Sequence, residues 1–476
     1  MAIPSFNPKI SVILRKVPRR DGAARVSYLA AGVIPEIDLT PYLGEQGGVV
    51  TNRGIHQAGG AFSITLADRM DQKSQDTLYA SIEPMDMVEI RMARVQKGST
   101  LPIVMRGFVS HVERVESVGQ DGRPARTVHV TGHDYGKLLQ IMQISYQKEY
   151  IYGRYLLTSF PMIERYGVLY NGTAKKFVED TMSHFVNDFL GDMFLFSGLE
   201  QAPVFLTDAS VTGARVGPYG IPNFEGSIWQ LLSNWTDIGW NELYIEDRED
   251  AAYLVYRPVP YYDLAGNLIM ADQGAKAPPE IRVTAAEVEM SNMARSDQNV
   301  ANFFQVDAPQ AEILNMDWVR TQATQNGLVL DIGYRNNQLE IYGLKRMPAR
   351  SNQASDDGTT ETATGSVSDK TAQASSAGAW YKQRVAQLKA INRDNVVYEE
   401  GSLSMRGNEA IRPGNFIRLE RGGLNSRYYV THVTQQFNVY QSFKTTLQLS
   451  RGEGYIDRLN AHSSPYVGEK GKGAYG

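Results

Sequence analysis

The sequence predicts a mainly β fold with α+β insertions, in which two similar antiparallel strand domains flank a mixed α/β middle region. Three observations predict it. Short β-branched and aromatic runs alternate with turns rich in Gly and Pro. The 476 residues include 26 tyrosines and 43 glycines, a balance typical of strand-rich proteins. A set of three strand-like segments also occurs twice along the chain, in the same order.

Residues 1–140 are expected to form the first β domain, because they consist of short runs suited to strands with turns between them. The segment Gly119–Pro124 separates the last two runs, which predicts an antiparallel hairpin. The expected strands are Ile10–Leu14, Ala61–Asp68, Met87–Ala93, Ile103–Val115 and Arg126–Gly132.

Residues 141–280 are expected to form the mixed middle region. Apolar residues at helical spacing predict helices at about 174–190 and 227–237. For the second helix, Ser227 is the expected N-cap and Gly239 the expected terminator. Asn241–Asp247 and Ala252–Tyr262 then read as a hairpin.

Residues 281–350 and 396–456 are expected to form the second β domain. Its expected strands include Ile281–Met290, Asn302–Ala308, Leu339–Leu344, Asn415–Leu419, Arg427–Val439 and Phe443–Ser450. Residues 351–395 interrupt it with a low-complexity insertion, Ser351–Gly378, and a helix at about Ala379–Asn392. Residues 457–476 read as a C-terminal tail.

The repeat consists of three strands in the same order. IEPMDMVEI (Ile82–Ile90) precedes FVSHV (Phe108–Val112), and IRPGNFIRL (Ile411–Leu419) precedes YVTHV (Tyr429–Val433). A Thr-rich strand ending near Gly follows each. The pattern predicts a duplicated strand module in which Val109 and Val430 occupy superimposable strands. The alternative is the general likeness of β-hairpins.

The repeated histidines raise the question of a metal site. His111 and His432 occupy equivalent positions, and we match His129 with Gln448. His133 and Asp134 are near His129 in sequence, but i, i+4 spacing does not bring ligands onto one face of a strand. We therefore interpret the histidines as polar strand residues.

No catalytic constellation is found in the sequence, so no catalytic, cofactor-binding or metal-binding residue is predicted and the protein is expected not to be an enzyme. GKGAYG (Gly471–Gly476) matches a dinucleotide-loop pattern, but no helix follows it. The remaining candidates have commoner structural explanations: the acidic clusters Glu246–Asp250, Asp356–Asp357 and Glu399–Glu400, the basic segment Arg15–Arg25, and the aromatic segment Tyr146–Tyr155.

Bulk composition excludes several classes of protein. The absence of cysteine excludes disulfides, thiolate metal sites and cysteine nucleophiles. A net charge of −4 gives no overall attraction to nucleic acid. No apolar run approaches the roughly 20 residues of a membrane helix, and the N-terminus lacks the pattern of a secretory signal.

Four segments, taken in order, resemble the central baseplate hub protein of contractile-tailed bacteriophages, which is related to the hub part of type VI secretion spike proteins. Met87–Leu139 resembles that family's first tube domain, and Ser227–Asp263 its middle region. Ser296–Pro309 and Gly401–Tyr455 resemble its second tube domain. The resemblance extends from about Ile10 to Tyr455, excepting the insertion Ser351–Gly378.

The resemblance implies a homotrimer of tube-type antiparallel β-barrels, two per subunit, arranged as a pseudo-sixfold ring. Such a ring would join a sixfold tail tube to a threefold central spike and line the DNA channel. The implied partners are the tail tube, central spike, tape-measure and other baseplate proteins, with DNA only in transit and no cofactor. The implied location is the virion tail baseplate, assembled in the host cytoplasm.

Two other functions are consistent with the same sequence. One is a tail-associated protein that binds or hydrolyses cell-wall glycan through the aromatic middle region. The other is the hub of a contractile injection system that does not belong to a phage. Oligomeric mass and co-assembly with tube and spike proteins distinguish the hub from the glycan-directed protein.

Overall fold

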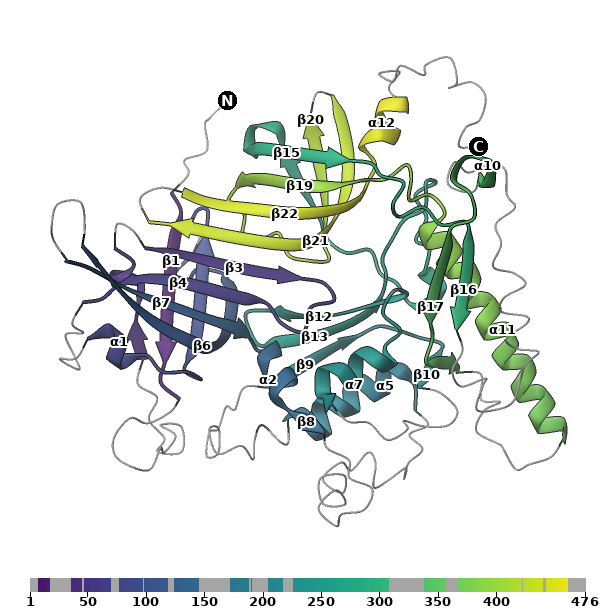
Figure 1. The fold of residues 1–476 in the computed structure, drawn as a ribbon, viewed down its shortest axis with the longest axis horizontal. Helices are drawn as coiled ribbons and strands as arrows, with labels where there is room; N and C mark the ends of the chain where they lie inside the picture. Colours follow the sequence, from purple (N-terminus) through teal and green to yellow (C-terminus); the bar gives the residue numbers. More distant parts are fainter. Residues whose placement is uncertain are drawn as a thin grey trace, which may run out of the picture.

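A computed structural model of the protein confirms the mainly β fold class (Figure 1). Thirteen strands of the described chain belong to one sheet, and smaller sheets and helices lie beside it. The structure describes residues 7–17, 36–44, 47–69, 77–96, 98–118, 124–144, 172–187, 190, 204–216, 226–307, 338–356, 367–421, 423–439 and 442–460.

The first strand module occupies the N-terminal part of the chain. Its strands are β1 (Lys9–Arg15), β2 (Glu36–Asp38), β3 (Gly48–Gly54), β4 (Ala61–Ala67), β5 (Met87–Ala93), β6 (Ile103–Val118) and β7 (Pro124–Asp134), with the short helices η1 (Thr40–Tyr42) and α1 (Leu78–Ser81). The spatial order is β3-β4-β7-β6-β5-β1-β2, antiparallel throughout. The five predicted strands are present, whereas β3 was not predicted because it follows a Gly-rich turn directly.

The second module repeats this order. Its strands are β14 (Glu280–Thr284), β15 (Val288–Ala294), β19 (Glu399–Arg406), β20 (Phe416–Arg421), β21 (Leu424–Asn438) and β22 (Ser442–Gly452), with the short helix η4 (Ala285–Glu287) and the terminal helix α12 (Gly454–Asn460). The spatial order β15-β19-β22-β21-β20-β14 matches β3-β4-β7-β6-β5-β1 strand for strand. One pair differs: β14 is parallel to β20, whereas β1 is antiparallel to β5.

The proline-led turns that open β5 and β20 have the same geometry. In the first, the N–H of Asp86 donates to the carbonyl of Glu83 over 3.1 Å, and Met85 has a φ of +73°. In the second, Asn415 donates to Arg412 over 3.2 Å, and Gly414 has a φ of +82°. Proline followed by a positive φ defines a type II turn, so both copies enter the strand identically.

Both copies also have the same irregularity in the long central strand. The register of β6 against β7 shifts between Val109 and His111, and that of β21 against β22 shifts between Val430 and His432. Val109 and Val430 therefore occupy equivalent strands, as predicted. The registers also correct the predicted match of His129 with Gln448. Counted from the register shift, His129 and Thr446 occupy the same position, two residues beyond that of Gln448, so His129 is equivalent to Thr446.

The two modules are joined edge to edge. Strand β3 of the first pairs antiparallel with the C-terminal half of β21 of the second. Figure 1 shows the result, in which β4, β3, β21, β22 and β19 run side by side across the boundary between the modules. This pairing makes one continuous sheet from segments almost 400 residues apart in sequence.

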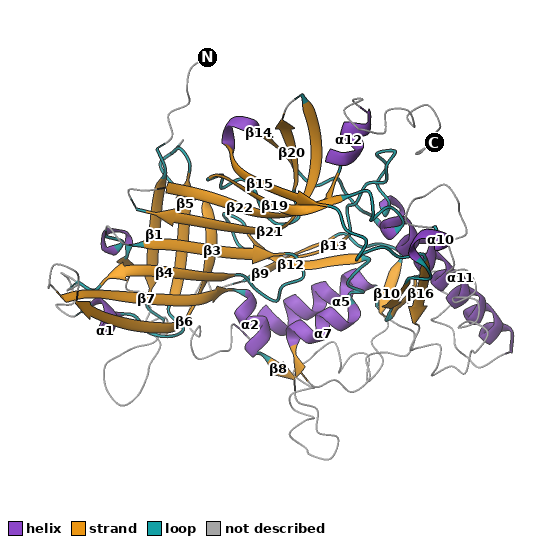
Figure 2. Cartoon of the chain, turned by 45° about the horizontal axis from the view of Figure 1, so that its top comes forward, coloured by secondary structure: helices purple, strands orange, loops and turns teal. Residues whose placement is uncertain are grey.

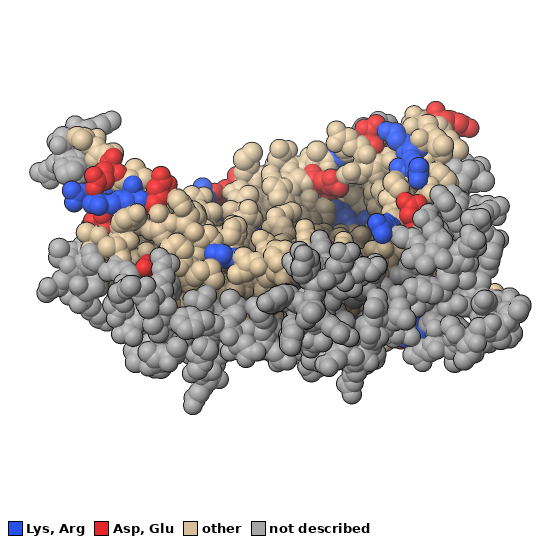
Figure 3. Space-filling model, turned by 60° about the horizontal axis from the view of Figure 1, so that its bottom comes forward, with Lys and Arg blue, Asp and Glu red and all other residues tan. Residues whose placement is uncertain are grey.

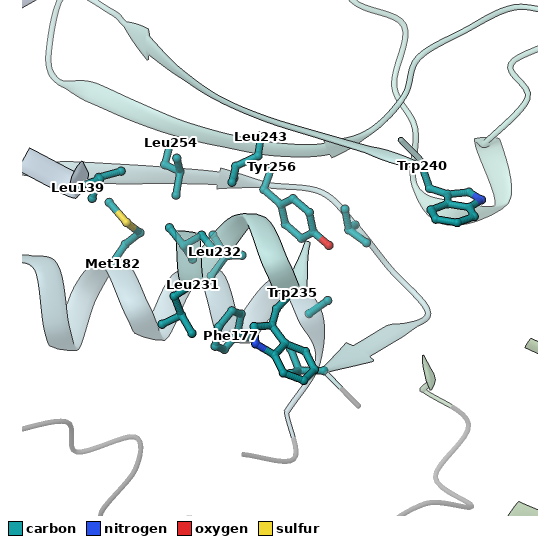
Figure 4. Packing of buried hydrophobic residues seen from close by; sticks show 14 of the residues in the cluster. Leu139, Phe177, Met182, Leu231, Leu232, Trp235, Trp240, Leu243, Leu254 and Tyr256 are labelled. Atoms are coloured by element: carbon teal, nitrogen blue, oxygen red, sulfur yellow. The ribbon is translucent and has the colours of Figure 1, made fainter. Parts of the chain in front are cut away.

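The middle region packs beneath that sheet. Its elements are α2 (Gly136–Ile141), β8 (Gln143–Ile144), α5 (Ala174–Asp180), a π-helical turn η2 (Thr181–Asn187), β9 (Phe205–Ala209), β10 (Ala214–Val216), β11 (Gly226–Ser227), α7 (Ile228–Trp235), β12 (Asn241–Asp247), β13 (Ala252–Pro258) and η3 (Ala271–Gln273). Ser227 caps α7 as predicted, in a capping box with Gln230. Leu231, Leu232 and Trp235 belong to one buried cluster. Leu232 lies toward Leu243 and Tyr256 of the sheet of β12, β13 and β9, whereas Leu231 and Trp235 lie on the side of Phe177 (Figure 4).

The long insertion of the second module joins the middle region's core. Its elements are β16 (Phe303–Asp307), α10 (Leu339–Tyr342), β17 (Arg346–Arg350), β18 (Gln353–Ser355) and α11 (Val367–Asn392). Strands β16 and β17 pair with each other, and β18 pairs with β10. Trp380 and Leu388 of α11 belong to the same hydrophobic cluster as Trp240. The range 281–350, expected in one domain, is thus shared between the large sheet and this core.

Two expectations in the insertion were wrong in detail. The helix expected at about Ala379–Asn392 begins earlier, at Val367, since the Ala- and Ser-rich stretch before it continues the helix. Leu339–Leu344, expected as a strand, contains the short helix α10. Its three apolar residues suit either structure, and so short a run cannot separate them.

Candidate functional site: the joint between the modules

The joint is the ladder between β3 and β21, which runs from Gly48 opposite Asn438 to Gly54 opposite His432. At one end, Phe437 and Phe443 of the second module are buried in the hydrophobic core of the first, together with Val49. At the other end, a Cβ on Gly54 would lie 2.3 Å from the ring of His432, so glycine permits this close approach. The joint is therefore part of the folded core.

Beneath the joint, Arg53 of β3 lies between two buried carboxylates. Its guanidinium hydrogen-bonds Asp247 of β12, and its Nε is 3.8 Å from Oδ2 of Asp134. Asp134 also accepts the N–H groups of Gly60 (2.7 Å) and Gly136 (2.9 Å). Burial raises the pKa of Asp134 to about 7, against the opposing effect of Arg53, and the charge of Asp247 adds to the rise.

The hairpin of β12 and β13 is tied to the second module as well. Arg257 pairs with Glu242 (Nε–Oε2 2.9 Å) and donates to the carbonyl of Gly414 over 2.7 Å, at the type II turn. The hydroxyl of Tyr429 hydrogen-bonds Glu242. Arg412 pairs with Glu246 over 3.1 Å. One hairpin thus fixes the orientation of both modules.

These contacts account for the acidic cluster Glu246–Asp250. Besides Asp247 and Glu246, Glu249 pairs with Arg91 over 2.9 Å, and Asp250 accepts a hydrogen bond from Tyr253 over 2.7 Å. A pocket at the joint is lined by Glu246 of this cluster and by Arg53 and Arg412, all of which are ion-paired. Glu246, Asp247 and Glu249 therefore form structural ion pairs that hold elements together.

The other sequence candidates are dispersed. His111 is exposed on β6, and Nδ1 of His129 is 3.1 Å from Thr65 Oγ1. Glu399 accepts from Tyr428 over 2.7 Å, and Glu400 is 3.3 Å from Asn299. Within the described ranges no group of three or more metal-ligating side chains converges. Tyr146–Tyr155, Gly471–Gly476, Asp357 and Arg19–Arg25 lie outside the described residues.

The face of the shared sheet that points away from both cores is polar and mostly uncharged. Cross-strand pairs such as Thr434–Thr446 and Ser402–Gln448 place these residues on one face. The charged residues of this face include Arg406 and Lys444, which lie near strand ends, and Glu113 of β6, which lies opposite His129. The uncharged residues of this face include Val50, Asn52, Ser63, Thr65, His129, Thr131, Ser402, Ser404, Thr434, Gln436, Thr446 and Gln448.

Charge elsewhere is mixed. On the face shown in Figure 3, acidic and basic side chains lie close to one another toward the two ends, with few between them. No helix in the described part of the chain is long and apolar enough to span a membrane.

The geometry defines a mainly β protein in which two copies of one module share a sheet. No protein-family model matches the sequence, and neither does any curated protein. Among solved structures, the chain is similar to a tail protein from Neisseria meningitidis, with a TM-score of 0.46, 10% identity, and coverage of 94% of this chain and 97% of that one.

Two further solved structures are similar to the chain: one is of a prophage tail protein, and the other is of a component of a secretion system. The 43 kDa tail protein of prophage MuSo2 from Shewanella oneidensis has a TM-score of 0.43 at 11% identity, covering 94% of this chain and 98% of that one. An Escherichia coli component of the type VI secretion system, described as similar to the bacteriophage T4 tail proteins gp27 and gp5, has a TM-score of 0.36 at 9% identity, covering 85% and 73%.

Proposed function

We propose that this protein is the non-enzymatic structural hub of a phage tail baseplate. Three subunits form a ring of six strand modules, which joins a sixfold tail tube to a threefold central spike. In this assignment the first tube domain is residues 1–140, and the second is built from β14, β15 and β19–β22. Other baseplate proteins contact the outside of the ring.

The observation that carries the proposal is the duplicated module. The two copies share six strands in one order, the same type II turn and the same register shift. A threefold assembly of such chains presents six nearly equivalent modules, so one ring can contact threefold and sixfold partners.

The polar face of the shared sheet supports a role as a channel wall. Its central residues carry hydroxyl and amide groups, such as those of Thr434, Thr446 and Gln448. DNA binds proteins mainly through phosphates held by Lys and Arg, so a wall whose central residues carry no such charges lets DNA move past. In the ring this face lines the lumen, which holds the tape-measure protein before DNA passes.

The test is the mass of the assembly and its place in the virion. Native mass spectrometry should give three times the 53.0 kDa of the chain. Symmetry-averaged electron microscopy of the tail tip should place six strand modules in one ring between tube and spike. A monomer that degrades purified peptidoglycan would contradict the proposal and support a glycan-directed function.

A further inference from the structure

The open strand edges of the large sheet include one on β6 and one on β15, besides those of β2 and β14. In β6, residues His111–Val118 pair with β7 on one side and, within the described chain, with nothing on the other. Strand β15 pairs with β19, and its other side is equally open among the described residues. Figure 2 shows β15 and β6 on opposite sides of the row formed by β19, β22, β21, β3, β4 and β7. Beyond β6 the sheet continues with β5, which pairs with the first half of β6.

The duplication indicates what belongs on these edges. Strand β6 is equivalent to β21, and β15 is equivalent to β3. Inside the chain, the C-terminal half of β21 pairs with β3. The equivalent pairing, β6 with β15, is absent within the subunit because six other strands of the sheet separate β6 from β15. It can form only between two copies of the chain.

We propose that β15 of one subunit adds antiparallel to residues His111–Val118 of β6 in the next subunit. This rests on the proposed ring and names the edges that close it. Carrying the register of β3 and β21 over to β15 and β6 places Val115 opposite Asn292 and Ser117 opposite Met290. Such an interface joins two different surfaces, which generates a closed ring.

Side-chain exposure on the two edges supports this pairing. Val118 is 75% exposed, whereas its equivalent Val439 is packed against the first module's core at the joint. In the proposed register Met290 lies opposite Ser117, the residue before Val118, and Met290 is 64% exposed. An open strand edge with exposed apolar residues is a surface for strand addition.

The polarity of the two edges is also matched. At the joint, Val49 faces Phe437, and both are buried. The equivalents of Val49 and Phe437 are Ser291 on β15 and Glu116 on β6. Both members of the pair in the proposed interface are therefore polar. The contact between subunits is therefore more polar than the joint, as suits subunits that are soluble before they assemble.

The experiment uses engineered disulfides, for which the cysteine-free chain is well suited. The N–H of Ile55 donates to the carbonyl of Thr431, so the pair Val50–Gln436, and its equivalent Asn292–Val115, falls at a non-hydrogen-bonded position. There the two Cα atoms are about 4.5 Å apart, within disulfide range. The full chain carrying Val115→Cys and Asn292→Cys should form covalent trimers on mild oxidation.

The matched control is Val115→Cys with Ser291→Cys, since a one-residue offset turns the second thiol to the opposite face. It should remain largely uncrosslinked. Mixing the two single variants should yield covalent dimers and no covalent trimer. Trimers of normal mass without the Val115–Asn292 crosslink would overturn this pairing and leave the proposed ring intact. Monomers at every concentration would overturn both.

Discussion

Asp134 shows at the scale of one residue how the joint depends on buried charge. It shares the guanidinium of Arg53 with Asp247, so two carboxylates compete for one cation in a buried position. Asp134 also accepts hydrogen bonds from the N–H groups of Gly60 and Gly136. A proton on Asp134 relieves this arrangement, and burial raises its pKa to about 7.

The raised pKa predicts a pH dependence. Between about pH 4 and 7, Asp134 is protonated in the folded protein but ionised in the unfolded chain. The contribution of Asp134 to the free energy of unfolding is therefore complete below about pH 4 and is lost as the pH rises toward 7. Asp134→Asn removes this dependence. The stability of wild type relative to Asp134→Asn should therefore fall from pH 4.5 to 7.5, by at most about 3 kcal/mol at 1.36 kcal/mol per pKa unit.

The measurement is urea unfolding of both proteins at one protein concentration, because subunit association also contributes to stability. Comparing variant with wild type at each pH cancels the other carboxylates, such as Asp86, whose pKa burial raises to about 6. If the stability of wild type relative to Asp134→Asn stays constant or rises with pH, Asp134 is ionised in the folded protein.

A helix or strand can be predicted from its own sequence when the residues that bury it lie nearby in the chain. Helix α7 lies within the range expected from its capping residue and apolar spacing. Strands β5 and β12 have the expected bounds, since alternation and turns mark both ends. Strand β3 was missed because its Val49 and Thr51 are buried only once β21 pairs beside it. Its signal, GVVTN, is a weak alternation directly after glycines.

The open edge of β6 makes a prediction at the element scale. Hydrogen-bonded and non-hydrogen-bonded positions alternate, so the N–H of Glu116 points away from β7 toward the proposed neighbour. Glu116→Pro removes that donor without removing a hydrogen bond of the subunit. It should shift assembly toward monomer, as sedimentation would detect, with an unchanged circular dichroism spectrum.

Glu116→Ala is the matched control, because it removes the same side chain and its contacts with Arg114 and Arg126 but keeps the N–H. It should remain trimeric. Equal loss of assembly in both variants would assign the effect to the side chain and argue against strand addition at this edge.

Among the described residues of the polar face, the basic side chains are Arg406 and Lys444, and both lie near strand ends rather than at the centre. Placing lysine there should interfere with DNA movement in the assembled tail. Virions carrying Gln436→Lys or Gln448→Lys, each at an exposed position of this face, should assemble normally but eject DNA more slowly. The delay should shrink with added salt, since screening weakens phosphate contacts.

Thr100→Lys adds the same charge at an exposed position in the loop before β6, away from this face, and should leave the ejection rate unchanged. Time-resolved DNA release from purified virions measures the effect. An equal rate in all three particles would mean that the polar face does not line the path of DNA.

The sequence by itself determined many of the strands, the capped helix and the existence of two similar modules. These depend on local patterns: alternation with period two, turn residues, and a proline-led turn that the chain contains twice. Only the tertiary structure decided that β3 joins β21, that β14 runs parallel to β20, and that the long insertion completes the middle core. The physical reason is that pairing between distant strands, and burial of charges such as Arg53 and Asp134, depend on which edges and faces meet after the modules have folded.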